Sequence, residues 1–316
     1  MARSKRTVSI VIPCYNEEQN VDAFYRTVDN FSKTILYELE ILYVNDGSTD
    51  NTLRNLHNIA DKDRRVRIID LSRNFGKEIA TSAGIENATG EAIVLIDGDG
   101  QHPIELVGTF LTIWEMGTPV VVGVRVQNQK EGIVKKYGSK FFYSLFNRLS
   151  GVTLVPGVTD FCLIDRMVQL EYGKFTERNR ITRGLIEWLG YKREYVPFSA
   201  NARTAGEAGY TFSKLLSLAL NSFISLSLKP LYFAFYCGIV ILPISIFLAL
   251  FCGIEMLIGD PFNLGITGTA YLTILCLFLL GIALVSQGVM ALYLSHIHTE
   301  TQNRPLYVIN PVTSRQ

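Results

Sequence analysis

Short apolar runs alternate with helix-like segments over about the first 125 residues of the chain. The runs are rich in Val and Ile, and each has about the length of a strand that is buried on both faces; they cover residues 8–13, 39–46, 66–72, 92–99 and 120–125. The first segment between them carries apolar residues at helical spacing, namely Val21, Phe24, Tyr25, Val28 and Phe31. This alternation predicts an α/β fold with a mostly parallel sheet.

Polar clusters follow four of these runs directly. The clusters read PCYNEE, NDGSTD, SRNFGKE and DGDGQHP in chain order. Ligands of open α/β sheets bind at the carboxyl ends of the strands. We therefore expect the four clusters to meet at one edge of the sheet and to form a binding site there.

The pattern changes in the C-terminal third, where two long stretches carry no charge, residues 231–254 and 269–294. At about 1.5 Å per helical residue, each exceeds the roughly 30 Å of a hydrocarbon core, which predicts two transmembrane helices. Residues 210–228 precede them and mix apolar residues with Ser and Asn. A core helix is one interpretation, but the position favours an amphipathic helix that lies on the membrane.

The distribution of charged residues predicts how the two transmembrane helices are oriented in the membrane. The loop between the two apolar stretches carries acidic but no basic residues, whereas Lys214, Lys229 and Arg304 flank the outer ends. The positive-inside rule then places the outer ends and the N-terminal part in the cytoplasm. The expected organisation is a cytoplasmic domain (1–209), an amphipathic juxtamembrane helix (210–229), two transmembrane helices (230–295) and a cytoplasmic tail (296–316). The net charge of +1 gives no indication of a nucleic-acid partner.

The segment IDGDGQHP places Asp97, Asp99 and Gln101 directly after a buried strand. A tight turn is one explanation, because Asp and Gly are common turn residues. The other is a site for Mg²⁺ or Mn²⁺, which prefer hard oxygen ligands and neutralise the charge of a diphosphate. Both explanations remain open on this segment alone.

The order IVIPCYNEEQN, YVNDGSTDNT, LSRNFGKEIATSAGI and IDGDGQHP resembles the inverting GT-A glycosyltransferases of family 2. The chain looks most similar to the polyprenyl-phosphate branch, which includes bactoprenol glucosyltransferases and dolichyl-phosphate mannose synthases. The resemblance runs from about residue 8 to residue 308. It implies a GT-A type (Rossmann-like) domain, a Mg²⁺ or Mn²⁺ cofactor held by Asp97, Asp99 and Gln101, and a nucleotide-sugar donor.

Further site residues are expected around this metal site. Tyr15 can offer a ring face to a nucleobase, and Glu17 can accept hydrogen bonds from base or ribose, although Asn16 before two glutamates also reads as a helix cap. The resemblance assigns base recognition to Asp46 and places Asp160 beside the reaction centre with Asp99. The residues expected to bind the nucleotide sugar are Pro13, Tyr15, Asn16, Glu17, Asp46 and Asp97, and those expected to be catalytic are Asp160 and Asp99.

A lipid-phosphate acceptor requires cations. Arg125 follows the fifth apolar run, Lys135 and Ser139 lie one helical turn apart, and Arg203 falls in a segment that resembles a family motif. Ala208 and Gly209 stand where that motif usually has Ser and Lys. We expect Arg125, Lys135, Ser139 and Arg203 to bind the acceptor phosphate.

The resemblance implies inverting transfer of a hexose, glucose in the first instance, from a UDP-sugar to undecaprenyl phosphate. The protein is then a multi-pass protein of the bacterial inner (cytoplasmic) membrane, a homo-oligomer with a tetramer as the candidate, and its product serves to modify surface polysaccharide. One alternative is mannosyl transfer from GDP-mannose to the lipid phosphate. Another is a membrane-anchored scaffold without catalytic activity.

Overall fold

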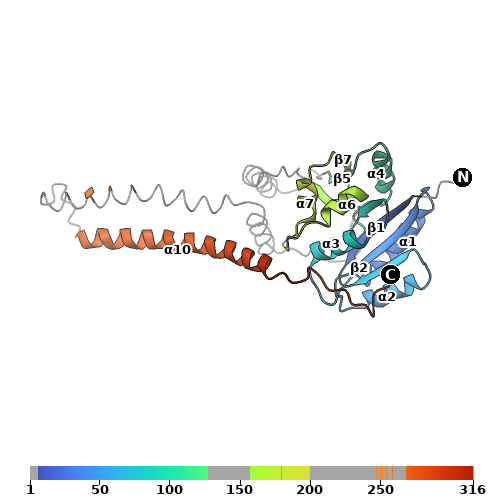
Figure 1. The fold of residues 1–316 in the computed structure, drawn as a ribbon, viewed down its shortest axis with the longest axis horizontal. Helices are drawn as coiled ribbons and strands as arrows, with labels where there is room; N and C mark the ends of the chain where they lie inside the picture. Colours follow the sequence, from blue (N-terminus) through green and yellow to red (C-terminus); the bar gives the residue numbers. More distant parts are fainter. Residues whose placement is uncertain are drawn as a thin grey trace. The chain divides into compact units, whose positions relative to one another are not determined.

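The computed structural model describes residues 6–126, 157–178, 180–199 and 268–315, together with the single positions 243, 247, 250, 251, 254 and 258. The described residues up to 199 form one compact unit with residues 304–315 (Figure 1). The helix α10 (Gly268–Thr301) belongs to a second unit.

A seven-stranded sheet with the order β3-β2-β1-β4-β6-β5-β7 forms the centre of the first unit (Figure 1). Its pairs β1·β2, β1·β4, β2·β3 and β5·β7 are parallel, whereas β6 is antiparallel to both β4 and β5. The predicted α/β fold with a mostly parallel sheet is therefore confirmed. The strands are β1 (Thr7–Cys14), β2 (Glu38–Asn45), β3 (Val66–Asp70), β4 (Ala92–Leu95), β5 (Val120–Arg125), β6 (Val158–Asp165) and β7 (Arg193–Phe198).

Helices cover both faces of this sheet, and each face has its own apolar core. The helices α1, α2 and α4 contribute to one core and α3, α6 and α7 to the other. Strands that are buried on both faces read as continuous Val and Ile runs, which is why the sequence shows them so clearly. The helices of this unit are α1 (Val21–Ser32), α2 (Thr52–Ala60), α3 (Lys77–Asn87), α4 (Leu106–Glu115), α6 (Arg166–Tyr172) and α7 (Thr182–Trp188).

The predicted helical spacing in α1 is confirmed by burial. Val21, Phe24, Val28 and Phe31 are all buried, and Tyr25 packs partly buried against the same core. The hydroxyl of Tyr25 donates a partly buried hydrogen bond of 2.8 Å to Asp63. An amphipathic stripe of this kind stabilises a helix by burying one face on the sheet.

The contact of α3 with the sheet depends on Gly84. A Cβ at this position would lie 2.2 Å from Cγ1 of Val11 and 3.1 Å from Cγ2 of Val44. We predict that Gly84→Ala lowers the free energy of unfolding by about 1–3 kcal/mol, because an overpacked core forces its neighbours to move. Thermal and denaturant unfolding of the full-length protein measure this change.

The matched control is Gly108→Ala in α4, where an added Cβ would meet no heavy atom within 4 Å. There the better helix propensity of Ala is expected to raise stability by up to about 1 kcal/mol. Equal effects of the two substitutions would contradict the packing explanation.

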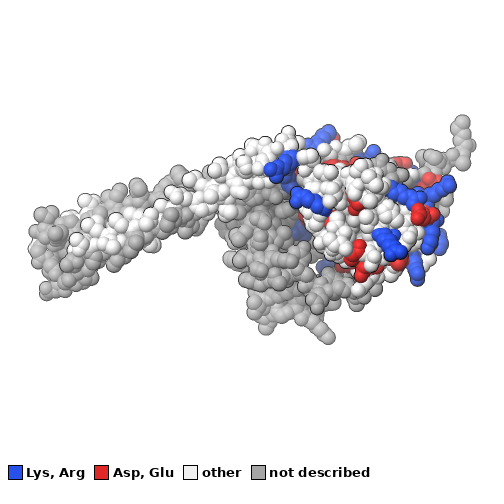
Figure 2. Space-filling view, turned by 90° about the horizontal axis from the view of Figure 1, so that it is seen from below, with Lys and Arg blue, Asp and Glu red and all other residues white. Residues whose placement is uncertain are grey.

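The helix α10 is 34 residues long and contains the predicted second membrane segment. Figure 2 shows charged side chains of both signs over the visible face of the first unit, whereas the described part of α10 is almost free of them. Within the described part of the chain, no helix combines the length and the apolar character that a membrane span needs. The two predicted transmembrane helices are thus not confirmed. Residues 210–229 and most of 231–254 lie outside the described residues.

Candidate active site

The site lies at the carboxyl ends of the central strands. The strands β2, β1, β4 and β6 are neighbours in the sheet. Of these, β2, β1 and β4 are parallel, so the segments that follow them leave the sheet at the same edge. The antiparallel strand β6 begins at that edge, so that Asp160, near the start of β6, comes to lie beside the end of β4. This arrangement explains how residues more than sixty positions apart share one site.

The centre of the site is an ion cluster of Lys77, Asp97 and Asp160. The Nζ atom of Lys77 lies 2.7 Å from Oδ1 and 2.8 Å from Oδ2 of Asp97, and 3.3 Å from Oδ2 of Asp160. Lys77 is the first residue of α3, which places it beside both strand ends. Sequence reasoning predicted Asp97 and Asp160 but missed Lys77, although the lysine stands inside the quoted segment SRNFGKE.

The cluster is half-exposed rather than enclosed. The side chain of Lys77 is 45% exposed, and those of Asp97 and Asp160 are 27% and 29% exposed. Burial alone would lower the pKa of Lys77, but the two carboxylates outweigh it and raise the pKa above its ordinary value. Lys77 therefore stays charged. It holds the carboxylates of Asp97 and Asp160 together at a position that solvent can reach.

A fourth charged group, Glu78, lies beside the cluster. Burial, followed by the negative charge of Asp160, raises the pKa of the Glu78 carboxyl. Its carboxylate accepts a hydrogen bond of 2.8 Å from the backbone N–H of Thr182. Glu78 thereby connects the start of α3 to the start of α7.

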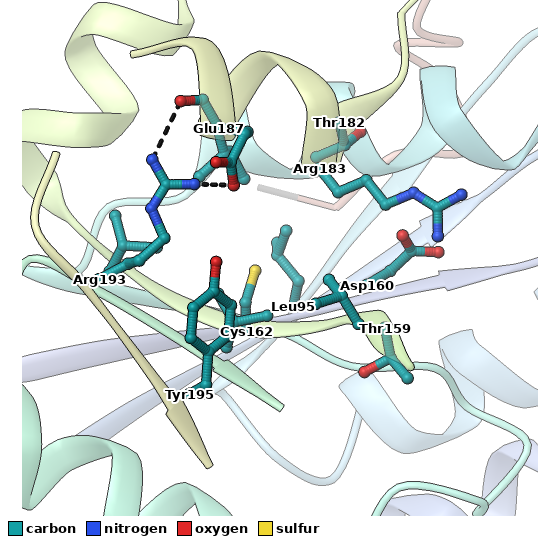
Figure 3. A pocket seen from close by; sticks show the side chains of 13 residues that line it. Leu95, Thr159, Asp160, Cys162, Thr182, Arg183, Glu187, Arg193 and Tyr195 are labelled. Atoms are coloured by element: carbon teal, nitrogen blue, oxygen red, sulfur yellow. Dashed lines mark hydrogen bonds and ion pairs between the residues drawn. The ribbon is translucent and has the colours of Figure 1, made fainter. Parts of the chain in front are cut away.

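A small recess opens beside Asp160 (Figure 3). The side chain of Arg183 extends from α7 toward the Asp160 carboxylate, while Arg193 and Glu187 form an ion pair farther along the wall. The cavity volume of the recess is about 30 Å³, which exceeds the roughly 10–15 Å³ that a single water molecule requires. The recess therefore has room for at least a small polar group. Sequence reasoning also missed Arg183, since an arginine in a short helix carries no signal of its own.

The segment after β4 folds back on itself. Oδ1 of Asp99 accepts a hydrogen bond of 3.1 Å from the backbone N–H of Gln101, and Asp97 donates its own N–H to Nδ1 of His102 at 3.4 Å. The His102 ring stacks on Phe161 with 5.0 Å between ring centroids, and burial lowers the pKa of this histidine. His102 is thus a packing residue, and the turn explanation of the motif holds alongside any role in ligand binding.

The donor atoms of this segment suit a hard divalent cation, because carboxylate and amide oxygens are the ligands that Mg²⁺ and Mn²⁺ prefer. The sharing of Lys77 by Asp97 and Asp160 shows that the site already holds positive charge. Over the described ranges, no group of three or more His, Cys, Asp or Glu residues could hold a metal ion by itself. The assignment of Asp97, Asp99 and Gln101 as metal ligands therefore stays a prediction.

Asp46 has a role that its sequence position did not indicate. It is only 3% exposed, and its two carboxylate oxygens accept backbone hydrogen bonds from Phe75 at 2.7 Å and Gly76 at 2.9 Å. Burial raises the pKa of Asp46, and these two N–H groups oppose part of that shift. Asp46 thus holds the loop that leads into Lys77. Its predicted contact with the nucleobase stays a prediction.

The turn after Asp46 requires glycine. Gly47 has a φ of +63°, and a Cβ there would lie 2.4 Å from the carbonyl carbon of Arg73. Because of both the positive φ and this close approach, any residue other than glycine would destabilise the turn. The NDGS segment therefore packs directly against the loop before α3.

The segment after β1 carries the remaining residues of the predicted nucleotide site. Pro13 lies inside β1, one residue before its end. Tyr15 is 45% exposed, Asn16 has a φ of +54°, and the Oδ1 atom of Asn16 accepts a hydrogen bond of 2.8 Å from the N–H of Thr49. Glu17 accepts from the Asn20 side chain at 2.5 Å. Asn16 therefore does not cap α1, which begins at Val21.

Of the four predicted acceptor-binding residues, one lies in the described part of the chain. Arg125 ends β5 and is exposed. Lys135, Ser139 and Arg203 fall outside the described residues.

A family model described as "Glycosyl transferase family 2" matches residues 9–173. The chain is 38% identical over 305 residues to an uncharacterized glycosyltransferase of Synechocystis sp., covering 96% of this chain and 94% of the relative. It is 34% identical over 305 residues to the prophage bactoprenol glucosyl transferase homolog of Escherichia coli, covering 96% and 99%. The bactoprenol glucosyl transferase of Shigella phage SfII is 34% identical over 303 residues, with coverage of 96% and 97%.

Among solved structures, one similar chain is glucosyl-3-phosphoglycerate synthase from Mycobacterium tuberculosis in complex with Mn²⁺, UDP-glucose and phosphoglyceric acid. It is 18% identical, with a TM-score of 0.47, over 70% of this chain and 78% of that chain.

Proposed function

Because the chain belongs to glycosyl transferase family 2, and is therefore a glycosyltransferase, we propose that it transfers glucose from UDP-glucose to undecaprenyl phosphate. The observation that carries the proposal is the Lys77 cluster, which gathers Asp97 and Asp160 from two neighbouring strands at the ligand-binding edge of the sheet. Relatives named bactoprenol glucosyl transferase, which match over nearly the whole chain, support the acceptor and the sugar.

The donor diphosphate lies against the segment after β4 in this proposal. A divalent metal ion, when bound by Asp97, Asp99 and Gln101, supplies positive charge to the leaving diphosphate. Lys77 exchanges one of its carboxylate partners for a phosphate oxygen when the donor binds, so that the lysine charge stays neutralised throughout. The exposed ring of Tyr15 packs on the base, with Pro13, Asn16, Glu17 and Asp46 around it.

The acceptor phosphate approaches from the side of Asp160. An oxygen of the lipid phosphate attacks the anomeric carbon, the bond from that carbon to the UDP oxygen breaks, and UDP leaves with the electron pair. A phosphate monoester is largely ionised near pH 7, with a second pKa of about 6, so no strong base is required. Asp160 orients the sugar and stabilises positive charge at its anomeric carbon.

Cations around Asp160 hold the acceptor phosphate in this proposal. Arg183 extends toward Asp160 in the described structure (Figure 3), and the recess between them has room for a small polar group. Arg125, Lys135, Ser139 and Arg203 complete the proposed acceptor site. An arginine can bind a phosphate through two parallel hydrogen bonds, which suits Arg183 to this task.

The enzyme acts at the cytoplasmic face of the bacterial inner membrane, with the uncharged stretches 231–254 and 269–294 as its anchor. It assembles as a homo-oligomer, and its β-linked product is used to modify a surface polysaccharide. The limits of the cytoplasmic domain, the juxtamembrane helix, the anchor and the tail are those that the sequence predicts.

A donor panel tests the reaction. Full-length protein in detergent receives undecaprenyl phosphate, Mn²⁺ or Mg²⁺, and radiolabelled UDP- or GDP-sugars, and label is followed into the organic phase. We expect incorporation from UDP-glucose, and its loss when EDTA removes the metal. Incorporation from GDP-mannose alone would replace the proposed donor, and no incorporation into lipid from any sugar would contradict the proposed acceptor.

A further inference from the structure

The last residues of the chain form part of the sheet edge. Ile309 pairs with Leu71 and Arg315 pairs with Ile68, both in antiparallel bridges. The N–H of Ser72 donates to the carbonyl oxygen of Val308 at 2.9 Å. Since β3 is an edge strand of the sheet, this C-terminal segment covers backbone groups that an edge strand otherwise leaves open.

The segment makes its densest contacts with Asp70, the last residue of β3. The backbone N–H of Asp70 donates to Oγ of Ser314 at 3.0 Å, and its carbonyl oxygen accepts from the N–H of Asn310 at 2.8 Å. The hydroxyl of Thr313 donates to Oδ2 of the Asp70 carboxylate. Asp70 is only 5% exposed, and a buried carboxylate needs such donors.

The other carboxylate oxygen of Asp70 leads from the tail into the site. Oδ1 of Asp70 accepts from Nδ2 of Asn45 at 2.7 Å. Because the Asn45 amide donates in this direction, its carbonyl oxygen faces the other way and accepts from the hydroxyl of Ser48 at 2.5 Å. Asn45 is 1% exposed, and the backbone N–H of Ser48 also donates to its Oδ1 at 3.4 Å, so its orientation is set by Asp70 and Ser48.

The chain of hydrogen bonds ends on the loop after β1. Oγ of Ser48 accepts from the backbone N–H of Asn16 at 3.0 Å. The side chain of Asn16 in turn accepts from the N–H of Thr49 at 2.8 Å. Asn16 has a positive φ, a conformation that asparagine adopts more readily than most residues other than glycine. The exposed Tyr15 precedes it directly.

We propose that Thr313 is a positioning residue for donor binding, acting through Asp70, Asn45 and Ser48 on the backbone of Asn16. Its hydroxyl completes the donors around Asp70, which keeps the Asn45 amide in the orientation that Ser48 requires. The C-terminal segment thereby sets the conformation of the loop that presents Tyr15. This inference rests on the proposed function, because the role of that loop in nucleotide binding is part of the proposal.

Substitutions at Thr313 test the inference in the full-length protein. Thr313→Val keeps the shape but removes the hydroxyl, and Thr313→Ser keeps the hydroxyl. We expect Thr313→Val to raise the Kd for UDP and the KM for UDP-glucose about fivefold to tenfold, as for one lost hydrogen bond. We expect kcat to change by less than about twofold, because the reacting groups are untouched. Thr313→Ser is expected to restore wild-type binding.

The control is Arg315→Gln, which removes an exposed ion pair between the same segment and Asp61 and leaves the hydrogen-bond chain intact. It is expected to keep the wild-type Kd for UDP. A second test variant is Ser48→Ala. It removes the hydroxyl that bonds to Asn45 and Asn16 and leaves the C-terminal segment unchanged. It is expected to weaken UDP binding similarly, and the double variant with Thr313→Val to be less than additive.

The outcomes separate the two proposals. Wild-type protein that binds neither UDP nor UDP-glucose overturns the proposed function and this inference with it. Wild-type binding that is unchanged in Thr313→Val, or that is lost equally in Thr313→Ser, overturns the inference alone. If Thr313→Val does not fold, an unchanged Kd in Ser48→Ala overturns it.

Discussion

Replacement of Asp97 by Asn is expected to lower kcat/KM for sugar transfer by about 10²- to 10³-fold, the scale of losing one electrostatic group from a reacting centre. Asp97 is the closer carboxylate to Lys77 and is also a proposed metal ligand. The substitution therefore weakens the proposed metal site and removes one of the two carboxylates that position Lys77. Initial rates with UDP-glucose and undecaprenyl phosphate measure the loss.

The fold should survive this change. Lys77 keeps Asp160 as a partner, and a half-exposed ion pair contributes about 0–1 kcal/mol to stability. The unfolding midpoint is therefore expected to fall by no more than a few degrees. Wild-type turnover by folded Asp97→Asn protein would remove Asp97 from the reaction and with it the proposed site.

Replacement of Lys77 by Met is expected to lower turnover and to raise the affinity for Mn²⁺. Turnover should fall about 10- to 100-fold, because a charge-assisted hydrogen bond to the donor is lost. Affinity for Mn²⁺ in the absence of nucleotide should rise several-fold, since a positive charge beside the proposed metal ligand Asp97 is removed. Steady-state kinetics measure the first effect, and electron paramagnetic resonance of free Mn²⁺ measures the second.

Lys174→Met is the matched control for this experiment. Lys174 also pairs with an acidic residue, Glu171, but the pair is exposed on α6 and its following turn. Its loss should leave both turnover and Mn²⁺ affinity unchanged. If Lys77→Met weakens Mn²⁺ binding instead, the lysine supports the metal site rather than competing with it.

The parts of the fold that the sequence predicted are those with a local pattern. Five Val- and Ile-rich runs correspond to β1 through β5, and the spacing in α1 matches its buried face. The strands β6 and β7 were not predicted as strands. The run VTDFCLID is interrupted by polar residues near its start, and REYVPF contains a proline. The insertion of β6 between β4 and β5 is also a long-range pairing that no local pattern encodes.

The site likewise contains residues that the sequence predicted and others that it did not. The resemblance led to Asp97 and Asp160 as site residues, and the structure brings both onto Lys77. Lys77 itself was missed because a lysine at a helix start usually reads as a solvated charge. Its meaning depends on partners 20 and 83 residues away, which only the sheet order brings together.

The hydrogen-bond partners of Asp46 could not be predicted from its sequence motif. The resemblance suggested contact with a nucleobase, and the observed partners are backbone N–H groups 29 and 30 residues later. A buried carboxylate takes whichever donors the tertiary structure brings within reach. The C-terminal segment shows the same limit, because its bridges to β3 span more than 200 residues.

The most direct measurement of the central claim is an experimental structure of the protein with Mn²⁺ and UDP-glucose, in which anomalous scattering locates the manganese. The account predicts manganese bonded to the side chain of Asp97 and the diphosphate, Lys77 on a phosphate oxygen, and the sugar beside Asp160. Manganese and diphosphate bound away from Asp97, with Lys77 still held between Asp97 and Asp160, would contradict it.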